Sequence, residues 1–305
     1  MTIWKLFPAG ALNPPRQEIN SLRLFLLTLA AMIAFAGNSL LCRAALKQTS
    51  IDAASFSSIR LLSGAAALWL IASLRSARWR QAGNWPSALA LFAYAAAFSF
   101  AYVSLSAATG TLLLFGAVQA TMILWGLRKR EALRATQLFG LALAFAGFLL
   151  LVFPGLSSPP LHASILMLAA GVAWGIYSLR GKGATDPVAT TTGNFLRAIP
   201  FAALLGLAFI PRAHLDSLGL GYAVLSGALA SGLGYVIWYS ALPGLTAAGA
   251  ATVQLSVPVL AASGGILLLG EPVTLRLFLA SIAILGGIAL VVISRRAPHK
   301  LRTYS

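Results

Sequence analysis

The sequence is poor in charged residues and in the side chains from which metal sites and disulfide frameworks are built. Charged residues make up only 9% of its 305 residues, about one third of the share that is usual in a soluble domain. It has three histidines and a single cysteine, Cys42, so no disulfide can form within the chain. These absences exclude a soluble domain of this length and an oxidative, disulfide-rich scaffold.

The acidic residues are informative by their positions as well as by their small number. All six lie between long apolar runs or near the ends of such runs: Glu18, Asp52, Glu131, Asp186, Asp216 and Glu271. Proton antiport through a carboxylate buried in mid-membrane is therefore disfavoured, and facilitated diffusion or exchange is favoured. The histidines also lie outside the apolar runs, and no nucleotide-binding motif is present. We therefore predict no enzyme, no metal and no cofactor.

Apolar runs of membrane-spanning length recur along the chain. The sequence is 59% hydrophobic, with a mean hydropathy of +0.86, and a run of about 20 apolar residues crosses the hydrocarbon core as a helix. Alternating barrel strands are not seen, so the fold class is an all-α polytopic membrane protein with ten transmembrane helices. The predicted spans are 22–42, 53–74, 86–106, 110–127, 134–153, 163–180, 188–210, 218–240, 246–269 and 273–293.

The distribution of basic residues predicts the orientation of the chain. With the N-terminus in the cytoplasm, sixteen Lys and Arg residues fall on the cytoplasmic side, four fall outside and two lie within spans, which accounts for all 22. This excess predicts that both termini are cytoplasmic in a bacterial-type inner membrane. Residues 1–21 are expected to be a cytoplasmic lead-in, and residues 294–305 a basic cytoplasmic tail. The net charge of +16 thus indicates membrane orientation and lipid contact, not a nucleic-acid partner.

Unusual residues recur with similar spacing in the two halves of the chain. Arg60 follows Arg43 by 17 residues, and Arg197 follows Arg180 by 17. The sequence AYVSLSAATG in the first half is also matched by GYVIWYSALPG in the second. Because each half contains five predicted spans, the second half enters the membrane in the opposite orientation. We therefore expect inverted repeats, as in secondary transporters that bind substrate between them.

We expect the first repeat to cover residues 22–153 and the second to cover residues 163–293. The segment LGEPVTLRLFLASIAILGGIALVV, residues 269–292, resembles the closing part of the EamA family in the drug/metabolite transporter superfamily. The ten spans, the five-plus-five repeat and the arginine in the second span of each half agree with this resemblance, which extends over residues 22–293. It implies a secondary transporter that works by alternating access. Ten helices are enough for a self-contained monomer, but the sequence does not determine the oligomeric state.

Three shorter segments narrow the resemblance. WGIYSL, YVIWYSAL and LSVPVL are similar to segments of the YddG-type exporters of aromatic and other neutral amino acids. This similarity implies export of amino acids and similar small metabolites. Phe35 departs from that pattern, because a tryptophan is expected at its position, so the shape of the pocket is expected to differ.

Aromatic and neutral polar residues within the spans are the candidates for a substrate cavity. Tyr94, Phe98 and Tyr102 recur every four residues and form one helical stripe. Rings around a cavity would suit an apolar or aromatic ligand, or a cationic amine, and neutral polar groups could bind an amino acid. The same side chains could instead pack or hydrogen-bond between helices. The predicted cavity residues are Phe35, Asn38, Phe98, Tyr102, Gln119, Trp174, Tyr177, Tyr235, Trp238 and Gln254.

Two arginines lie within the spans, where charge is expensive. Arg60 and Arg197 could attract a substrate carboxylate, or could satisfy backbone carbonyls at helix ends and snorkel to the interface. Inverted symmetry would place them on opposite sides of the midplane, which favours the structural interpretation. In the fourth and ninth spans, small residues and proline suggest gating, or alternatively plain close packing. The gating candidates are Gly110, Gly116, Pro243, Gly244 and Pro258.

The sequence therefore predicts a small-molecule exporter with a central cavity bounded by the first, third, fourth, sixth, eighth and ninth spans. Within transport, the alternative is an exporter of lipophilic cations such as methyl viologen, which the same aromatic lining could serve. A membrane scaffold or receptor subunit without transport activity is the alternative of another class, and the inverted repeat argues against it.

Overall fold

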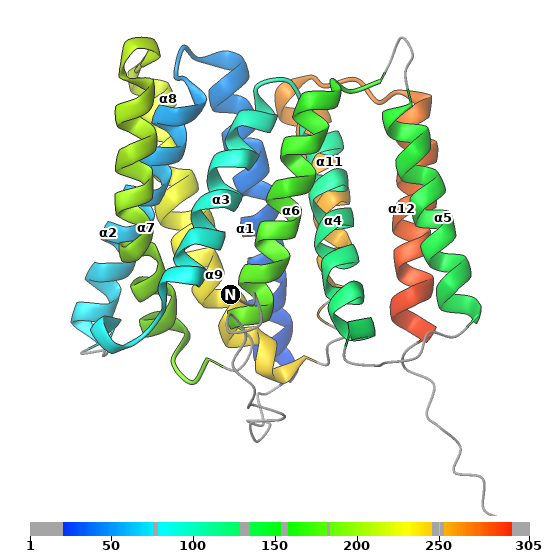
Figure 1. Cartoon of the computed structure of the whole chain (residues 1–305), viewed down its shortest axis with the longest axis horizontal. Coiled ribbons are helices and arrows are strands. Elements are labelled where there is room, and N and C mark those ends of the chain that lie inside the picture. Colours follow the sequence, from blue (N-terminus) through cyan, green and yellow to red (C-terminus); the bar gives the residue numbers. More distant parts are fainter. Residues whose placement is uncertain are drawn as a thin grey trace, which may run out of the picture.

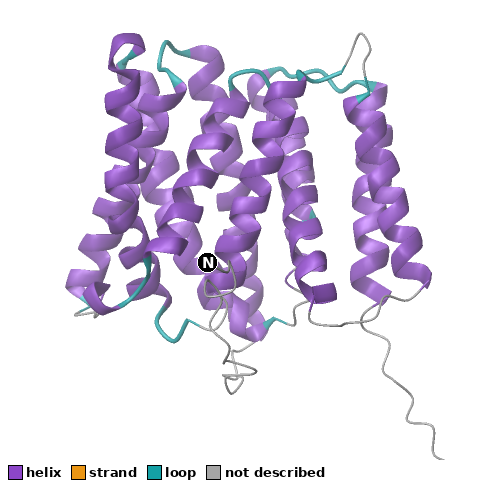
Figure 2. Cartoon of the chain, in the orientation of Figure 1, coloured by secondary structure: helices purple, strands orange, loops and turns teal. Residues whose placement is uncertain are grey.

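The computed structural model describes residues 21–75, 79–128, 135–153, 158–181, 184–245, 250 and 253–294. Across these ranges the chain consists of helices joined by short turns, with no strand (Figure 2). The predicted N-terminal lead-in and the basic tail lie outside the described residues, except for their last and first residues, Ser21 and Ser294. Glu131 also lies outside them.

Ten helical rods run between two faces of the described structure (Figure 1). The eighth rod is composite, because α8 continues through a π-helical segment, η4, into α9. The elements are α1 (Ser21–Gln48), α2 (Ala53–Leu74), α3 (Trp85–Tyr102), α4 (Ala107–Arg128), α5 (Ala135–Val152), α6 (Leu161–Gly181), α7 (Pro187–Phe209), α8 (Ser217–Leu225), η4 (Ser226–Leu233), α9 (Gly234–Ala241), α11 (Ser256–Leu269) and α12 (Leu275–Ser294).

The rods have the composition of membrane spans. Seven of the described helices are long and apolar enough to cross a membrane, and α5, α11 and α12 are shorter apolar helices. Large apolar side chains are exposed on the outside of the bundle, among them Leu74 at 79% and Leu267 at 81% exposure. Contact of such an apolar surface with lipid is favourable, whereas its exposure to water would cost free energy. The prediction of a ten-helix polytopic membrane protein is therefore confirmed.

An even number of crossings brings the two ends of the helical region to one side. In Figure 1, α1 begins and α12 ends at the lower face of the bundle, which we call the terminal face. The opposite side, where the turn between α1 and α2 lies, is the far face. The helix α6 runs antiparallel to α1 (Figure 1), as an odd number of spans in each half requires.

Acidic and amide side chains cap the N-termini of several helices. Asp52, Asn84, Asp186 and Asp216 are N-caps of α2, α3, α7 and α8, and each accepts a hydrogen bond from a backbone N–H of the first turn. Such caps satisfy donors that a helix leaves unpaired at its start. Three of the six acids therefore serve helix starts at the two faces of the membrane.

The Asp52 and Asp216 carboxylates also join neighbouring turns on the far face. Asp52 accepts a hydrogen bond from the backbone N–H of His214 at 3.0 Å, and Asp216 accepts one from the N–H of Ser50 at 3.0 Å. Partial burial raises the pKa of Asp52, but hydrogen bonds from Ser55 and neighbouring N–H groups hold this pKa below its usual value. The turn before α2 is thereby fixed to the turn before α8.

Small residues let the helices approach closely. α5 packs along α12, and a Cβ added at Gly140 would lie 2.6 Å from the carbonyl oxygen of Gly287. The π-helical segment packs on α2, and a Cβ at Gly227 would collide with the carbonyl of Arg60. Close approach at glycine is a common way to pack helices in lipid, where the hydrophobic effect gives no drive.

Candidate substrate site

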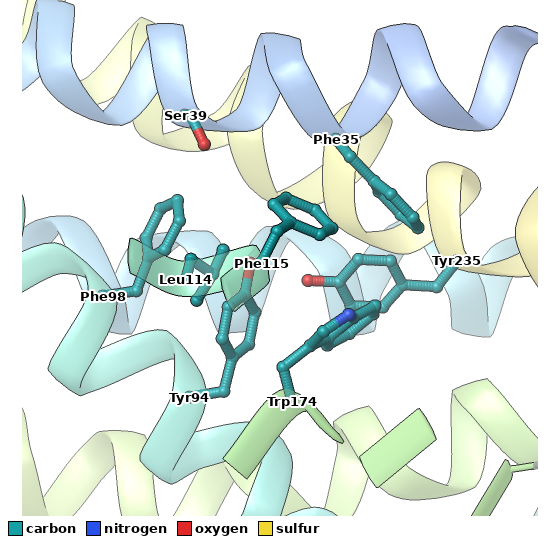
Figure 3. A pocket seen from close by; sticks show the side chains of 8 residues that line it. All are labelled: Phe35, Ser39, Tyr94, Phe98, Leu114, Phe115, Trp174 and Tyr235. Carbon is teal, nitrogen blue, oxygen red and sulfur yellow. The ribbon is translucent and has the colours of Figure 1, made fainter. Parts of the chain in front are cut away.

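A cavity lined largely by aromatic side chains lies between α1, α3, α4, α6 and α9. Its lining residues are Phe35, Ser39, Tyr94, Phe98, Leu114, Phe115, Trp174 and Tyr235 (Figure 3). The residues from α1, α3, α4 and α6 come from the middle parts of their helices. The cavity volume is about 10 Å³, which is room for about one water molecule. An organic substrate can therefore enter only when the lining side chains move apart.

The rings fill most of the space that they surround. Trp174 lies at the centre of the group, with ring centroids 4.6 Å from Tyr235, 5.1 Å from Tyr94 and 5.6 Å from Phe35. Tilted and edge-on arrangements at such distances are favourable for aromatic pairs. A flat apolar ligand could replace these contacts with similar ones, so the cavity suits an aromatic or branched apolar body.

Arg60 lies behind the tyrosines of this cavity and is only 1% exposed. Its Nη2 donates to the hydroxyls of Tyr94 at 3.1 Å and Tyr235 at 3.2 Å, and its Nε donates to Ser231 at 3.0 Å. The guanidinium also lies 4.9 Å from the ring centroid of Phe98, within the range of a cation–π contact. In the described part of the chain, Arg60 has no carboxylate partner, and its Nη1 has no hydrogen-bond partner.

Asn38 connects the same group to the π-helical segment. Its side-chain amide donates to the Tyr94 hydroxyl at 3.1 Å and accepts from the hydroxyls of Ser226 at 2.6 Å and Ser231 at 3.5 Å. These two serines lie five residues apart, which is the hydrogen-bond period of a π-helix. The π-helical segment therefore presents both hydroxyls to α1 and α2 from one stretch of eight residues.

The structure places the ten predicted cavity residues in different settings. Phe35, Phe98, Trp174 and Tyr235 line the cavity. Trp238 is buried, and its ring centroid lies 5.8 Å from that of Phe35. Asn38 does not line the cavity, but its amide donates a hydrogen bond to the hydroxyl of Tyr94, which does. The others are buried but do not line it: Tyr102, Gln119, Tyr177 and Gln254. Within the described residues, the side-chain carbonyl of Gln254 has no hydrogen-bond partner.

Five residues at the site were not on the list of predicted cavity residues. Tyr94, which belongs to the predicted stripe, lines the cavity with Ser39, Leu114 and Phe115, and Ser231 binds Arg60. Ser39 adjoins the predicted Asn38, and the leucine and phenylalanine lie in the fourth span, so proximity in the sequence could have suggested them. Ser231 carried no such signal, because its position depends on the π-helical geometry.

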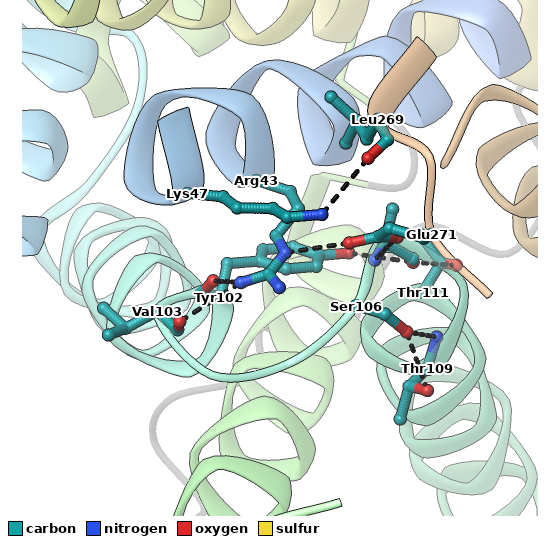
Figure 4. Close-up of polar contacts among 10 residues, drawn as sticks. Arg43, Lys47, Tyr102, Val103, Ser106, Thr109, Thr111, Leu269 and Glu271 are labelled. Carbon is teal, nitrogen blue, oxygen red and sulfur yellow. Dashed lines mark hydrogen bonds and ion pairs between the residues drawn. The ribbon is translucent and has the colours of Figure 1, made fainter. Parts of the chain in front are cut away.

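A set of polar contacts joins helices and turns at the far face (Figure 4). Arg43 donates from Nε to Oε1 of Glu271 at 2.9 Å and from Nη1 to the carbonyl of Tyr102 at 2.9 Å. The other carboxylate oxygen of Glu271 accepts from the N–H of Ala107 at 2.8 Å, and Lys47 donates to the carbonyl of Leu269 at 3.1 Å. We call this set the far-face latch, because it joins α1, the turn between α3 and α4, and the turn between α11 and α12.

A second set of contacts joins helices at the terminal face. Arg180 of α6 donates to Ser87 at 2.9 Å and to the side chain of Asn84 at 2.9 Å, both at the start of α3. Arg197 of α7 donates to the carbonyl of Ala82 at 2.8 Å, and Asn194 accepts from the N–H of Asn84 at 2.9 Å. We call these contacts the terminal-face tie. Arg197 thus binds backbone carbonyls and does not line the cavity, as expected of a structural anchor.

The chain is similar to known proteins over most of its length. The model of the EamA-like transporter family matches residues 161–293. An uncharacterized protein of Pseudomonas aeruginosa is 60% identical over 274 residues, which cover 90% of this chain and 96% of that protein. The chain belongs to the EamA-like transporter family. The uncharacterized transporter YwfM of Bacillus subtilis is 27% identical to it over 85% of this chain and 90% of that protein.

A crystal structure of another protein shares this fold. One solved chain superposes with a TM-score of 0.62 at 19% identity, and the match covers 88% of this EamA-like chain and 99% of that chain. Its family makes the chain a membrane transporter, and its helical bundle contains an aromatic cavity. The latch joins elements at one face of the bundle, and the tie joins helices at the other.

The gating candidates of this EamA-like transporter lie at different depths in the bundle. A Cβ at Gly110 would collide with the ring of Tyr102, whereas one at Gly116 would meet only Ile284, at 3.8 Å. Pro243 and Gly244 belong to a short 3₁₀ turn, Leu242–Gly244, after α9. Pro258 follows a helical interruption at Leu255, just before α11. Proline has no N–H to donate to the residue four positions earlier, which explains the interruption.

Proposed function

We propose that the protein exports amino acids, aromatic and other neutral ones, and similar small metabolites by alternating access. The observation that carries the proposal is a cavity at mid-helix depth in an EamA-like transporter, whose largely aromatic lining includes Ser39, Tyr94 and Tyr235. Amino acids of this class combine an apolar body with a polar head, and the cavity offers both kinds of surface. No cofactor or metal is needed for such binding.

The packing of the helices supports two inverted repeats. Exchange of the halves maps α2 onto α7 and α5 onto α12, and both of these pairs are in direct contact. The same exchange maps the contact of α3 with α6 onto the contact of the composite eighth rod with α1. Helix contacts that transform into one another are expected of a pseudo-two-fold axis in the membrane plane.

Two arginines at equivalent positions in the two halves lie at opposite faces of the bundle, although their partners do not exchange. Arg43 of α1 binds the end of α3 at the far face, whereas Arg180 of α6 binds the start of α3 at the terminal face. One repeat thus fastens one side of the bundle and the other repeat fastens the opposite side. We infer that the latch and the tie open in turn, because a substrate site must be open to one face at a time.

The structure then corresponds to an occluded state. A cavity of about 10 Å³ is far smaller than the several hundred cubic ångströms of a typical ligand site, about 300 Å³ or more. Opening of either face must separate α3, α4 and α6 from α1 and α9. We place the terminal face in the cytoplasm, because Arg23, Arg75, Arg80, Arg128 and Arg180 lie toward it and the positive-inside rule then holds.

The proposal is tested by transport with purified protein in proteoliposomes. Uptake of labelled phenylalanine, threonine and methyl viologen is measured with and without a pH gradient. We expect phenylalanine flux that unlabelled amino acids suppress and that does not depend on the gradient. Trp174→Ala should reduce this flux, because it removes the central ring of the cavity. Trp69→Ala is the matched control, because Trp69 is 48% exposed on the outside of α2.

The outcomes separate the possible functions. Flux of methyl viologen alone would replace the proposal with export of lipophilic cations. Amino-acid flux that stops when the gradient is removed would show proton coupling and would refute facilitated transport or exchange. Absence of flux for all three solutes would refute the proposed substrate class.

A further inference from the structure

The interior of the described bundle holds a cation that its acidic residues do not neutralise. Arg60 keeps its charge at all physiological pH values, and a buried charge is normally paired. Glu271 pairs with Arg43, and Asp52, Asp186 and Asp216 cap helices at the two faces. The described residues therefore leave a positive potential beside the cavity, and an anionic ligand would compensate it.

The hydroxyls of Tyr94 and Tyr235 connect Arg60 to the cavity wall by hydrogen bonds. A phenolic oxygen accepts up to two hydrogen bonds and donates one. The Tyr94 oxygen accepts from Arg60 at 3.1 Å and from Asn38 at 3.1 Å, so what remains is its contact with the Tyr235 hydroxyl, which a ligand oxygen would replace. The Tyr235 oxygen accepts from the same Arg60 nitrogen at 3.2 Å. Both rings line the cavity and extend toward each other (Figure 3).

Hydroxyls whose lone pairs are held by a cation become stronger donors, because hydrogen bonds in a chain polarise one another. Their natural partner is a negatively charged oxygen, which forms shorter and stronger bonds than a neutral one. An ammonium group is repelled by the same potential. Ser39, whose hydroxyl also faces the cavity, adds a further possible donor.

We propose that the cavity wall formed by Tyr94 and Tyr235 is a carboxylate subsite, in which the two tyrosines bind the substrate anion and Arg60 supplies the charge behind them. The apolar body then lies among Phe35, Phe98 and Trp174. The substrate class is small monocarboxylates with an aromatic or branched apolar body, with or without an amino group. This inference rests on the proposed transport function, and it makes the carboxylate, not the ammonium, the group that is selected.

Two analogues of phenylalanine test the inference. 3-Phenylpropionate lacks the amino group, and phenethylamine lacks the carboxylate. Each is added as a competitor of labelled phenylalanine in the proteoliposome assay. Binding to detergent-purified protein is measured separately through tryptophan fluorescence, since Trp174 lies in the cavity. We expect 3-phenylpropionate to compete and to change the fluorescence, and phenethylamine to do neither at the same concentration.

Tyr235→Phe isolates the hydroxyl without removing the ring. It should weaken 3-phenylpropionate binding about tenfold or more, the effect of losing one hydrogen bond to a charged group. Tyr239→Phe is the matched control, because Tyr239 is buried on the same helix but does not line the cavity. Arg60→Lys, which keeps the charge, should bind 3-phenylpropionate more tightly than Arg60→Gln. Since Arg60→Gln can fail to fold, the tyrosine variant carries the test independently.

The results distinguish this inference from the proposed function. If phenylalanine is transported but phenethylamine competes as well as 3-phenylpropionate, the carboxylate subsite is refuted and amino-acid export stands. Unchanged 3-phenylpropionate binding in Tyr235→Phe would refute it as well. If 3-phenylpropionate binds as expected but no amino acid is transported, the subsite stands and the proposed function fails.

Discussion

The far-face latch makes a prediction that can be worked out from the structure. Glu271→Gln removes the charge that faces Arg43, while the amide keeps an oxygen for the N–H of Ala107. In the closed state the two charged side chains are only 13% and 5% exposed, so their pairing is largely shielded from water. In a state open to the far face, both groups would be hydrated separately, and the substitution would change little. The variant should therefore destabilise the closed state selectively.

The size of the effect follows from the burial of the pair. Removal of one partner of a fully buried ion pair costs about 3–5 kcal/mol. Because glutamine retains hydrogen bonds, we expect about 2 kcal/mol, the value typical of a hydrogen bond to a charged group. Since about 1.4 kcal/mol is a factor of ten in an equilibrium constant, the population of the open state should rise about 30-fold.

Cys42 provides the assay without any engineered label. It is the sole cysteine of the chain, is 0% exposed and directly precedes Arg43. When opening is rapid compared with alkylation, the rate of its reaction with a membrane-impermeant maleimide is proportional to the open population. We expect this rate in proteoliposomes to rise about 30-fold in Glu271→Gln. Cys42→Ser provides the unlabelled blank.

Asp216→Asn is the matched control for this experiment. It makes the same acid-to-amide change on the far face, but its contacts are with Ser50 and Gly219, away from the latch. Labelling is carried out well below the unfolding temperature of each variant, so that global unfolding does not contribute. An unchanged labelling rate in Glu271→Gln, or an equal rise in Asp216→Asn, would refute the assignment of the latch as the far-face closure.

Further predictions concern stability. Gly110→Ala should destabilise the protein by about 1–3 kcal/mol, because the new methyl group overlaps the Tyr102 ring; Gly116→Ala should be tolerated, and the unfolding temperatures of the two variants in detergent test this. Asp52→Asn should cost about 0.3–1 kcal/mol at neutral pH, because the amide keeps the capping oxygen but loses the negative charge that the helix N-terminus favours. Since hydrogen bonds hold the pKa of Asp52 below its usual value, its contribution is present above about pH 4 and is lost as the pH falls through the folded-state pKa. The difference between wild type and Asp52→Asn in denaturant titrations should therefore shrink from pH 7 to pH 3, and a constant difference would contradict the assignment.

The sequence by itself determined that the chain crosses the membrane as ten helices. The length and apolarity of each run are local properties, and every backbone group in lipid must be satisfied within its own segment. The residues at which helices end were harder to predict, because a helix can continue beyond its apolar stretch to a cap or an exposed turn. The first span, predicted to end at residue 42, continues to Gln48.

The sequence also indicated part of the cavity, because aromatic residues at helical spacing must share a face. It could not show which rings meet. Tyr102 belongs to the predicted stripe, yet its carbonyl and ring lie at the far-face latch, while Phe115 from another helix fills the cavity. The stripe fixes a direction around one helix, but the neighbour on that side is set by packing between helices far apart in the chain.

Only the tertiary structure decided the partners of the buried charges. Arg60 and Arg197 look alike in the sequence, yet one meets hydroxyls from α3, η4 and α9 and the other meets backbone carbonyls of a turn. The pairing of Arg43 with Glu271 joins residues 228 positions apart. Composition and periodicity act over a few helical turns, whereas these contacts depend on how ten helices pack. The sequence therefore determined that this protein spans the membrane, and the packing of its helices decided where its cavity, its buried charge and its latch lie.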